Sequence, residues 1–335
     1  MHTDSQIHIA CICGGTGGHT LLSGLARFAH VRPTAIANVT DSGGSSGRIR
    51  VISRGSLPPG DVRQCLHALL DKSNPDAEKL HHILTFRFPE GVADGHSSGN
   101  LFITGLEQML GGFDKALKVF EPYLRGRVIP VTLDDVQLLA IFEDDTVVFG
   151  EHYIDVPPPQ HNPRKRIKKL QLVPQPGRLN PDAREALLAA DLIVIGPGDL
   201  YTSILPNLLM DGMKEALWES PALKVYVVNV MTKRGETLGF SVRQFVGAIE
   251  SYLGKGVLTH VLANTARPND NHLAYYFQKE ETTPVLLEAS GIVDNLAYHG
   301  ADVLAVEERP DGSPLIRHDP DKLARAVLSL IGSIQ

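Results

Sequence analysis

The residues with chemical potential in this sequence gather around five short glycine clusters, which hold twelve of its 31 glycines. Glycine lets the backbone turn sharply or approach a ligand closely. Each cluster lies between a strand-like or loop segment and a helix-like segment. We therefore expect several strand-to-helix loops on one edge of a sheet, where open α/β sheets bind ligands. The clusters are Gly14, Gly15, Gly17 and Gly18; Gly43, Gly44 and Gly47; Gly60; Gly95 and Gly99; and Gly196 and Gly198.

The first cluster is typical of a phosphate-binding loop, because it follows a strand-like run and opens a helix. Backbone N–H groups and the helix dipole would hold a phosphate there, and Thr16 could add a hydroxyl donor. Thr20 occupies the place of the third glycine of G-x-G-x-x-G, and the Lys-Ser/Thr ending of a P-loop is missing. The alternative is a tight turn that binds nothing.

Asp41 opens the second cluster, directly after the second strand-like run. An acid at this place bonds a ribose in dinucleotide-binding folds, or it could ligate Mg²⁺ through oxygen. The residues after it supply donors suited to a phosphate or a sugar: Ser42, Ser45, Ser46 and Arg48. A Gly/Ser run is otherwise usually a flexible loop.

Asp61 follows the turn-forming Pro58-Pro59-Gly60 segment and precedes a predicted helix, Val62–Leu70. One interpretation makes it the N-cap of that helix. The other brings it to Asp41, where the two carboxylates would share a metal ion or position a substrate hydroxyl, since paired carboxylates need a cation or a proton between them.

The last two clusters offer further polar groups at predicted helix starts. His96, Ser97 and Asn100 form a candidate anion site, in which His96 is either a general base or a structural hydrogen-bonding residue. After the strand Leu192–Ile195, a ring or ribose contact is expected from Tyr201 and Thr202, the alternative being a turn capped by Asp199. Further polar groups that could line the same crevice end the next strand: Asn229 and Thr232.

Apolar strand-like runs alternate with amphipathic stretches, which predicts an α/β, Rossmann-like three-layer fold with a mostly parallel sheet. The first helix is expected over Leu21–Ala29, and a small antiparallel hairpin over Leu138–Phe142 and Thr146–Phe149. Residues 157–181 contain seven prolines and a basic cluster, and we favour an extended surface segment over an interdomain linker. The whole chain, 1–335, is expected to be one large domain with an insertion near 133–181. The predicted strands are Ile7–Cys13, Thr34–Val39, Val128–Val131, Leu192–Ile195, Val225–Val230, Val257–Leu262 and Val303–Val306.

The composition is that of a globular protein, with 43% hydrophobic and 21% charged residues over 335 positions. A net charge of −6 makes the chain a poor generic binder of nucleic acids or membranes. Three cysteines exclude a disulfide framework and fit a reducing cytosol. No apolar run is long enough for a membrane span, and Met1–Ile7 lacks a signal pattern, so we expect the cytoplasm.

These motifs together resemble the YvcK/CofD-like family, and more closely its YvcK branch, the gluconeogenesis factors. The matching segments cover most of the chain: GGTGG-x-x-LLSGL, VTDSGGSSGRIR, PPGDVRQCL, GHSSGNL, GPGDLYTSILPNLL, NVMTKRGET and IRHDP. The resemblance implies a UDP-N-acetylglucosamine ligand and a regulatory role that links carbon supply to cell-wall growth and cell shape. It also implies ligand contacts at Thr16, at Arg317 and at a tyrosine, for which we choose Tyr276 within Tyr275-Tyr276-Phe277.

Three functions follow as hypotheses. The first is a regulator that binds a UDP-sugar without turnover, acting through a homo-dimer or a protein partner. The second, by analogy with the CofD branch, is an Mg²⁺-dependent transferase with a nucleotide diphosphate-linked donor and Asp41 and Asp61 as metal ligands. The third is an NAD-dependent oxidoreductase, which leaves four glycine clusters unexplained; NAD could still occupy the pocket as a similar dinucleotide.

Overall fold

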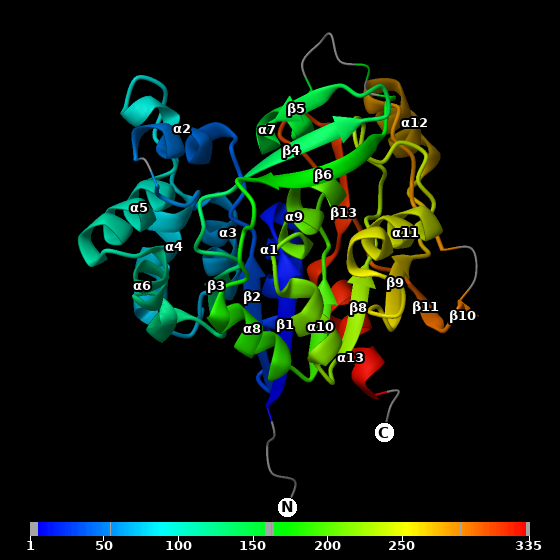
Figure 1. The fold of residues 1–335 in the computed structure, drawn as a ribbon, viewed down its shortest axis with the longest axis horizontal. Coiled ribbons are helices and arrows are strands. Elements are labelled where there is room, and N and C mark those ends of the chain that lie inside the picture. Colours follow the sequence, from blue (N-terminus) through cyan, green and yellow to red (C-terminus); the bar gives the residue numbers. More distant parts are fainter. Residues whose placement is uncertain (1–5, 54, 158–161, 163, 288–289, 333–335) are drawn as a thin grey trace, which may run out of the picture.

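The computed structural model describes residues 6–53, 55–157, 162, 164–287 and 290–332. Its centre is an eight-stranded sheet in the order β10-β11-β9-β8-β7-β1-β2-β3, in which every neighbouring pair is parallel except β10 and β11 (Figure 1). The strands are β1 (Ile7–Cys13), β2 (Val31–Ala37), β3 (Arg127–Pro130), β7 (Leu192–Ile195), β8 (Leu223–Val227), β9 (His260–Asn264), β10 (Gly291–Val293) and β11 (Leu296–Ala301).

Helices cover both faces of this sheet. The chain winds away from β1 in both directions, and right-handed crossovers place the helices of the two halves on opposite faces. On one side α1 (Gly15–Leu25) packs against α3 (Gly60–Leu69) and α13 (Pro320–Gly332). On the other side α10 (Met213–Glu219) packs against α8 (Pro181–Leu188) and α9 (Leu205–Leu208), and α9 contacts α11 (Val242–Leu253). The expected three-layer α/β architecture is confirmed.

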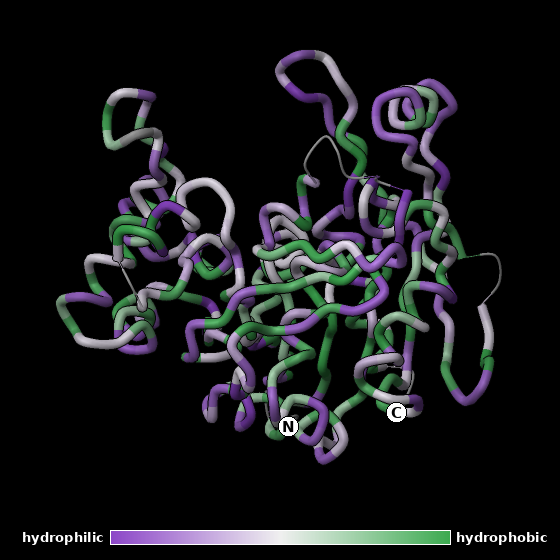
Figure 2. Tube along the Cα trace, turned by 45° about the horizontal axis from the view of Figure 1, so that its top comes forward, coloured by the Kyte–Doolittle hydropathy of each residue, from purple (hydrophilic) through white to green (hydrophobic). Residues whose placement is uncertain are grey.

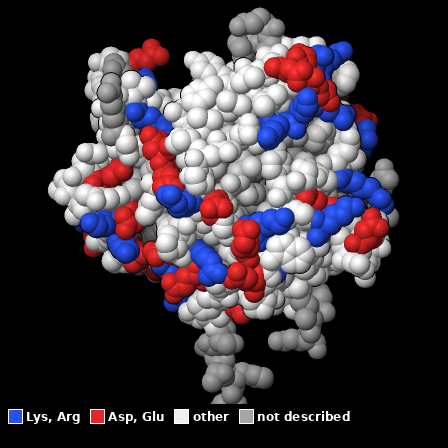
Figure 3. All heavy atoms as spheres, in the orientation of Figure 1, with Lys and Arg blue, Asp and Glu red and all other residues white. Residues whose placement is uncertain are grey.

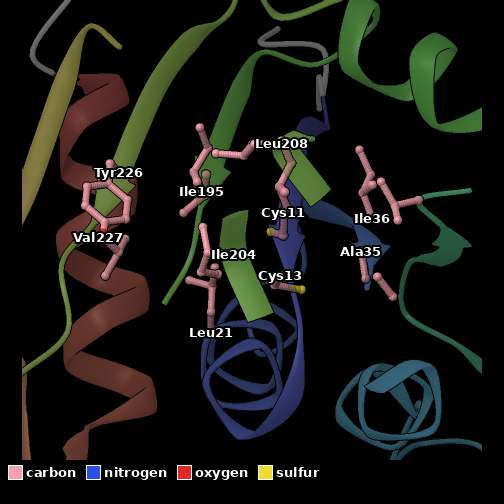
Figure 4. Close-up of a cluster of buried hydrophobic side chains, with 14 of the residues drawn as sticks. Cys11, Cys13, Leu21, Ala35, Ile36, Ile195, Ile204, Leu208, Tyr226 and Val227 are labelled. Atoms are coloured by element: carbon pink, nitrogen blue, oxygen red, sulfur yellow. The ribbon is translucent and has the colours of Figure 1, made fainter. Parts of the chain in front are cut away.

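The strands of the sheet are almost continuously apolar because both faces are covered. All residues of β7 are buried, as are the last five of β1. Figure 2 shows hydrophobic segments at the centre of the chain trace and hydrophilic ones toward its periphery. Figure 4 shows part of this core, with side chains contributed by β1, β2, β7, β8 and α1.

A lobe of helices follows β2 before the chain returns to β3. It comprises α2 (Gly44–Ile52), α4 (Pro75–Thr85), α5 (Ser98–Leu110) and α6 (Phe113–Lys118), and it lies at the left of Figure 1. After α11, the chain also forms the helix α12 (Asp270–Glu280) and an antiparallel hairpin of β12 (Leu304–Glu308) and β13 (Pro314–His318).

The expected hairpin is confirmed and belongs to a three-stranded antiparallel sheet. It pairs β4 (Gln137–Phe142) with β5 (Val147–Phe149) and with β6 (Ile167–Val173), and α7 (Glu151–Asp155) follows β5. The edge strand β6 exposes Lys168 and Lys169, so this part of the basic cluster is a solvated strand edge. Three of the seven prolines, Pro158, Pro159 and Pro163, lie outside the described residues, as do Met1 to Ser5 of the N-terminal segment.

Several expected boundaries are wrong. The first helix begins at Gly15 rather than Leu21, because the glycine loop itself forms its first turn. The second strand is Val31–Ala37 and ends before Val39, since the strand is set by pairing with β1 and β3. The run Val303–Val306 leads into β12, which pairs with β13 in a separate two-stranded sheet, whereas β11 supplies the parallel strand beside β9.

Charged side chains do not gather into a basic surface on the face drawn in Figure 3, where acidic and basic residues are interspersed. Among the described residues, no helix combines the length and the apolarity needed to cross a membrane.

Candidate functional site

A cavity of about 580 Å³ lies where the strand order reverses, at the carboxyl ends of β1 and β7. Ligands of open α/β sheets bind in the crevice at this point. Ten of the residues expected from the sequence to contact a ligand line it: Gly14, Gly15, Thr16, Gly17, Asp41, Asp61, Gly198, Thr202, Asn229 and Thr232. Loops after β1, β2, β7 and β8 therefore meet in one place, as the glycine clusters led us to expect.

The first glycine loop brings the N-terminus of α1 to the cavity wall. Gly14 is the N-cap of α1, and Thr16 is exposed in its first turn. A Cβ atom on Gly17 would lie 2.4 Å from the carbonyl oxygen of Pro197, so only glycine lets α1 approach the β7 loop this closely. Gly18 does not line the cavity; its Cα faces Cys13, and a side chain there would collide with the Cys13 sulfur.

Asp61 is a buried carboxylate on the cavity wall. It lies in the first turn of α3, whose N-cap is Pro59, so the N-cap interpretation of Asp61 is wrong. Its carboxylate accepts hydrogen bonds from Asn38 Nδ2, at 3.2 Å, and from the backbone N–H of Gly15. Burial, followed by the charge of Asp41, raises the pKa of Asp61 to about 7.

Glu151 adds a third acid that the sequence did not single out. It begins α7 in the insertion, accepts a hydrogen bond from the N–H of Ser42, and lines the cavity with Asp41. Burial and the neighbouring Asp41 raise the pKa of Glu151 to about 9, so its carboxyl carries a proton at neutral pH. Because Glu151 lies in the insertion, no short spacing in the sequence connects it with the glycine loops, and it could not be predicted as a site residue.

Lys233 is the centre of a second charge cluster on the same wall. Its ammonium forms ion pairs with Asp155, with Asp199 (2.7 Å) and with the buried Glu236 (2.9 Å). Burial opposes its charge, but the three acids outweigh burial and hold the pKa of Lys233 well above its usual value. These three carboxylates lie close enough to share one metal ion, yet the ammonium already bridges them. Glu236 also accepts hydrogen bonds from Tyr201 N–H and the Thr202 hydroxyl.

The fourth glycine cluster meets the second in a separate, buried polar group. Ser45 Oγ and His96 Nδ1 share a hydrogen bond of 2.9 Å, and the N–H of Ser97 donates to the same hydroxyl. Asn100 Nδ2 donates to Ser46 Oγ at 3.4 Å. None of these five residues lines the cavity; they join α2 to α5.

This polar group lies directly behind the cavity wall. A Cβ atom on Gly60 would be 2.4 Å from a carboxylate oxygen of Asp41 and 2.5 Å from the Ser46 hydroxyl. Gly60 is therefore the spacer between the cavity acid and the serine network, and it must lack a side chain.

The remaining residues of the second cluster do not line the cavity. The N–H of Gly43 donates to Asp41 Oδ1 at 2.8 Å, and Ser42 Oγ accepts from the N–H of His152. Gly44 begins α2 with a positive φ of 46°, and Arg48 is exposed one turn later.

The other expected contacts support the cavity from outside it. Gly196, with φ of 84°, turns the chain out of β7, and Tyr201 is buried in the core. The hydroxyl of Tyr276 accepts the N–H of Ile316, which itself lines the cavity. Arg317 pairs with Glu307 at 3.0 Å beside that residue.

Two further polar side chains belong to the cavity wall. Asn229 Oδ1 is buried and finds no hydrogen-bond partner among the described residues. Arg309, in the turn between β12 and β13, also lines the cavity and donates a hydrogen bond to Ser313 Oγ at 3.2 Å.

The family model described as 2-phospho-L-lactate transferase CofD matches residues 9–306. The chain belongs to the YvcK/CofD-like family. It is 37% identical to the gluconeogenesis factor of Listeria innocua, covering 99% of this chain and 98% of that protein, and 36% identical to the gluconeogenesis factor of Bacillus subtilis, covering 96% and 98%.

A solved structure of the family has the same fold. A crystal structure of a Bacillus halodurans protein superposes with a TM-score of 0.83 at 36% identity, covering 96% of this chain and 99% of that one. Another, of a Bacillus halodurans member of the UPF0052 family, gives a TM-score of 0.82 at the same identity.

The buried charge of Asp61 makes stability depend on pH. Because its pKa is 3.8 in the unfolded chain and about 7 in the fold, the folded state keeps a proton that the unfolded chain releases, and stability falls as pH rises from about 4 to 7. We expect Asp61→Asn to raise the free energy of unfolding at pH 8 by up to about 4 kcal/mol relative to wild type, with little gain at pH 4. Urea unfolding in a chelator measures this difference.

The matched control is Asp270→Asn, at a side chain that is 91% exposed, which should change stability by less than about 0.5 kcal/mol at either pH. An equal effect of Asp61→Asn at both pH values would contradict the raised pKa.

Proposed function

We propose that this chain binds a nucleoside-diphosphate sugar, UDP-N-acetylglucosamine, and acts as a regulator without turning it over. The observation that carries the proposal is the convergence of the α1 N-terminus and the β7 loop on one cavity. Helix N-termini bind phosphate through free N–H groups and the helix dipole. A cavity of about 580 Å³ has the size of small-molecule sites.

The charges of the cavity are compatible with a diphosphate only when its acids are partly neutral. Glu151 is protonated at neutral pH, Asp61 is partly so, and Lys233 offsets the acids around it. A protonated carboxyl can donate a hydrogen bond to a phosphate oxygen, which an ionised one cannot. The ligand's negative charge therefore meets proton donors and backbone amides.

Family membership supports the biological part of the proposal. Relatives that align over nearly their whole length are named gluconeogenesis factors. We infer a cytoplasmic role in which the nucleotide sugar reports carbon supply, and its binding alters a surface that controls cell-wall growth and cell shape through a protein partner or a second copy.

Replacing Thr16 tests the proposal. Thr16→Glu puts a negative, bulkier side chain at the exposed first turn of α1, where the phosphate would lie, and should weaken UDP-N-acetylglucosamine binding at least 100-fold in calorimetry. Thr16→Ser, which keeps a hydroxyl of similar size, should stay within about three-fold of wild type.

The charge-matched control is Thr85→Glu, at an exposed position near the end of α4 that does not line the cavity. It should bind as wild type does. Wild-type binding no tighter than millimolar, or equal binding by Thr16→Glu, would end the proposal.

A second candidate is an Mg²⁺-dependent transferase. Asp41 and Asp61 favour it, because two carboxylates on one cavity wall supply the oxygen ligands that Mg²⁺ takes and the cation would replace the proton on Asp61. The CofD description of the matching family model names a transferase. When bound, Mg²⁺ would neutralise charge on the leaving phosphate.

Turnover separates the two candidates. The transferase requires Mg²⁺-dependent release of nucleoside monophosphate from UDP- or GDP-linked donors in the presence of candidate acceptors. Chromatography measures this release. Asp41→Asn should reduce such release at least 100-fold. Release that Asp41→Asn leaves unchanged contradicts the assignment of the metal ligands.

A further inference from the structure

A second cavity of about 460 Å³ lies on the other side of α1, between α1, α3 and α4. Thr16 lines the first cavity, whereas His19 and Ser23, one and two turns further along α1, line the second. Apolar residues such as Ala68 and Leu70 form part of its wall. Neither the glycine loops nor the proposed diphosphate site accounts for its polar side chains.

Three histidines from three helices form a hydrogen-bonded row in this cavity. His19 Nε2 on α1 lies 3.1 Å from His67 Nδ1 on α3. The other nitrogen of the same ring, His67 Nε2, lies 2.9 Å from His81 Nδ1 on α4. The rings of His19 and His67 are stacked with centroids 5.0 Å apart. The central imidazole therefore presents one nitrogen to each neighbour.

Burial acts on two imidazoles of the row, His19 and His67. Burial, with smaller contributions from its two histidine neighbours, lowers the pKa of His67 to about 4. Burial and then the charges of Arg317 and Arg63 lower the pKa of His19. Metal binding needs the lone pairs of both His19 Nε2 and His67 Nδ1, so each of these rings would carry its proton on its other nitrogen.

We propose that His19 Nε2 and His67 Nδ1 bind one first-row transition-metal ion such as Zn²⁺, with His81 holding His67 in place. Two nitrogens at 2.0–2.1 Å from one tetrahedral zinc ion lie about 3.3 Å apart, close to the observed 3.1 Å. A histidine that ligates through Nδ1 carries its proton on Nε2 and typically donates it to a fixed acceptor. His81 Nδ1 is that acceptor at 2.9 Å.

The site is open toward the cavity, so water or a small ligand would complete the coordination. His19 and His81 contact opposite nitrogens of His67 and do not surround one point, which limits the protein ligands from this row to two. Lys72 and Glu78 line the cavity with opposite signs, and Arg317 and Arg63 add positive charge near His19. Imidazole suits zinc, nickel and copper rather than magnesium.

Calorimetry of the chelator-treated, then dialysed full chain with Zn²⁺ and with Ni²⁺ tests the proposal. We expect one ion per chain with micromolar or tighter affinity. His67→Gln and His19→Gln should each weaken binding at least 100-fold, and His81→Ala about ten-fold, as outer partners of metal ligands do. Zn²⁺ should also raise the melting temperature, since the ion joins α1 to α3.

His82→Ala is the matched control, because His82 is an exposed neighbour on α4 outside the row. It should bind the metal as wild type does. Circular dichroism and melting in chelator establish that each variant is folded. Absence of stoichiometric binding to wild type, or binding that survives both His19→Gln and His67→Gln, would overturn the site, and UDP-N-acetylglucosamine titrations remain an independent readout of the first cavity.

Discussion

The close approach of α1 to the loop after β7 is the constraint on which the site depends. Gly17 has no side chain to keep the helix from the Pro197 carbonyl, where a Cβ atom would lie at 2.4 Å. The contact brings the N-terminus of α1 and the helical turn after β7 to one cavity at the point where the strand order reverses. Without it, the two strand ends would still be neighbours, but their loops could not share a ligand.

A second constraint is electrostatic. The cavity gathers more acids than bases, an unusual surrounding for a diphosphate. Burial and mutual repulsion raise the pKa values of Asp61 and Glu151, so protons replace the cations that such a pocket would otherwise need. Lys233 compensates a different set of acids within the same wall. If protons neutralise these acids, the cavity suits a binding role, whereas a divalent cation in their place would suit a transferase.

The sequence allowed much of this architecture to be predicted. The near-continuous apolar runs predicted the observed bounds of β1 and β7, because strands that are buried on both faces are apolar along most of their length. The glycine loops identified the correct sheet edge, since glycine is placed where backbones meet closely. The start of α1 was misplaced because a glycine-rich turn has low helix propensity, and here packing against the β7 loop overrides it.

Other parts of the site left no local signal. Glu151 reaches the cavity from an insertion, and Lys233 acts through partners 34 and 78 positions away. The serines of the second cluster bond to His96 and Asn100 behind the wall, a pairing of helices that spacing does not reveal. Tyr276 supports β13 through a backbone hydrogen bond instead of lining the cavity.

A crystal structure of the chain with UDP-N-acetylglucosamine tests the central claim most directly. The account predicts the diphosphate within hydrogen-bond distance of backbone N–H groups in the first turn of α1, between Thr16 and the loop at Gly198. A diphosphate bound elsewhere, for example in the histidine-lined cavity behind α1, would contradict it.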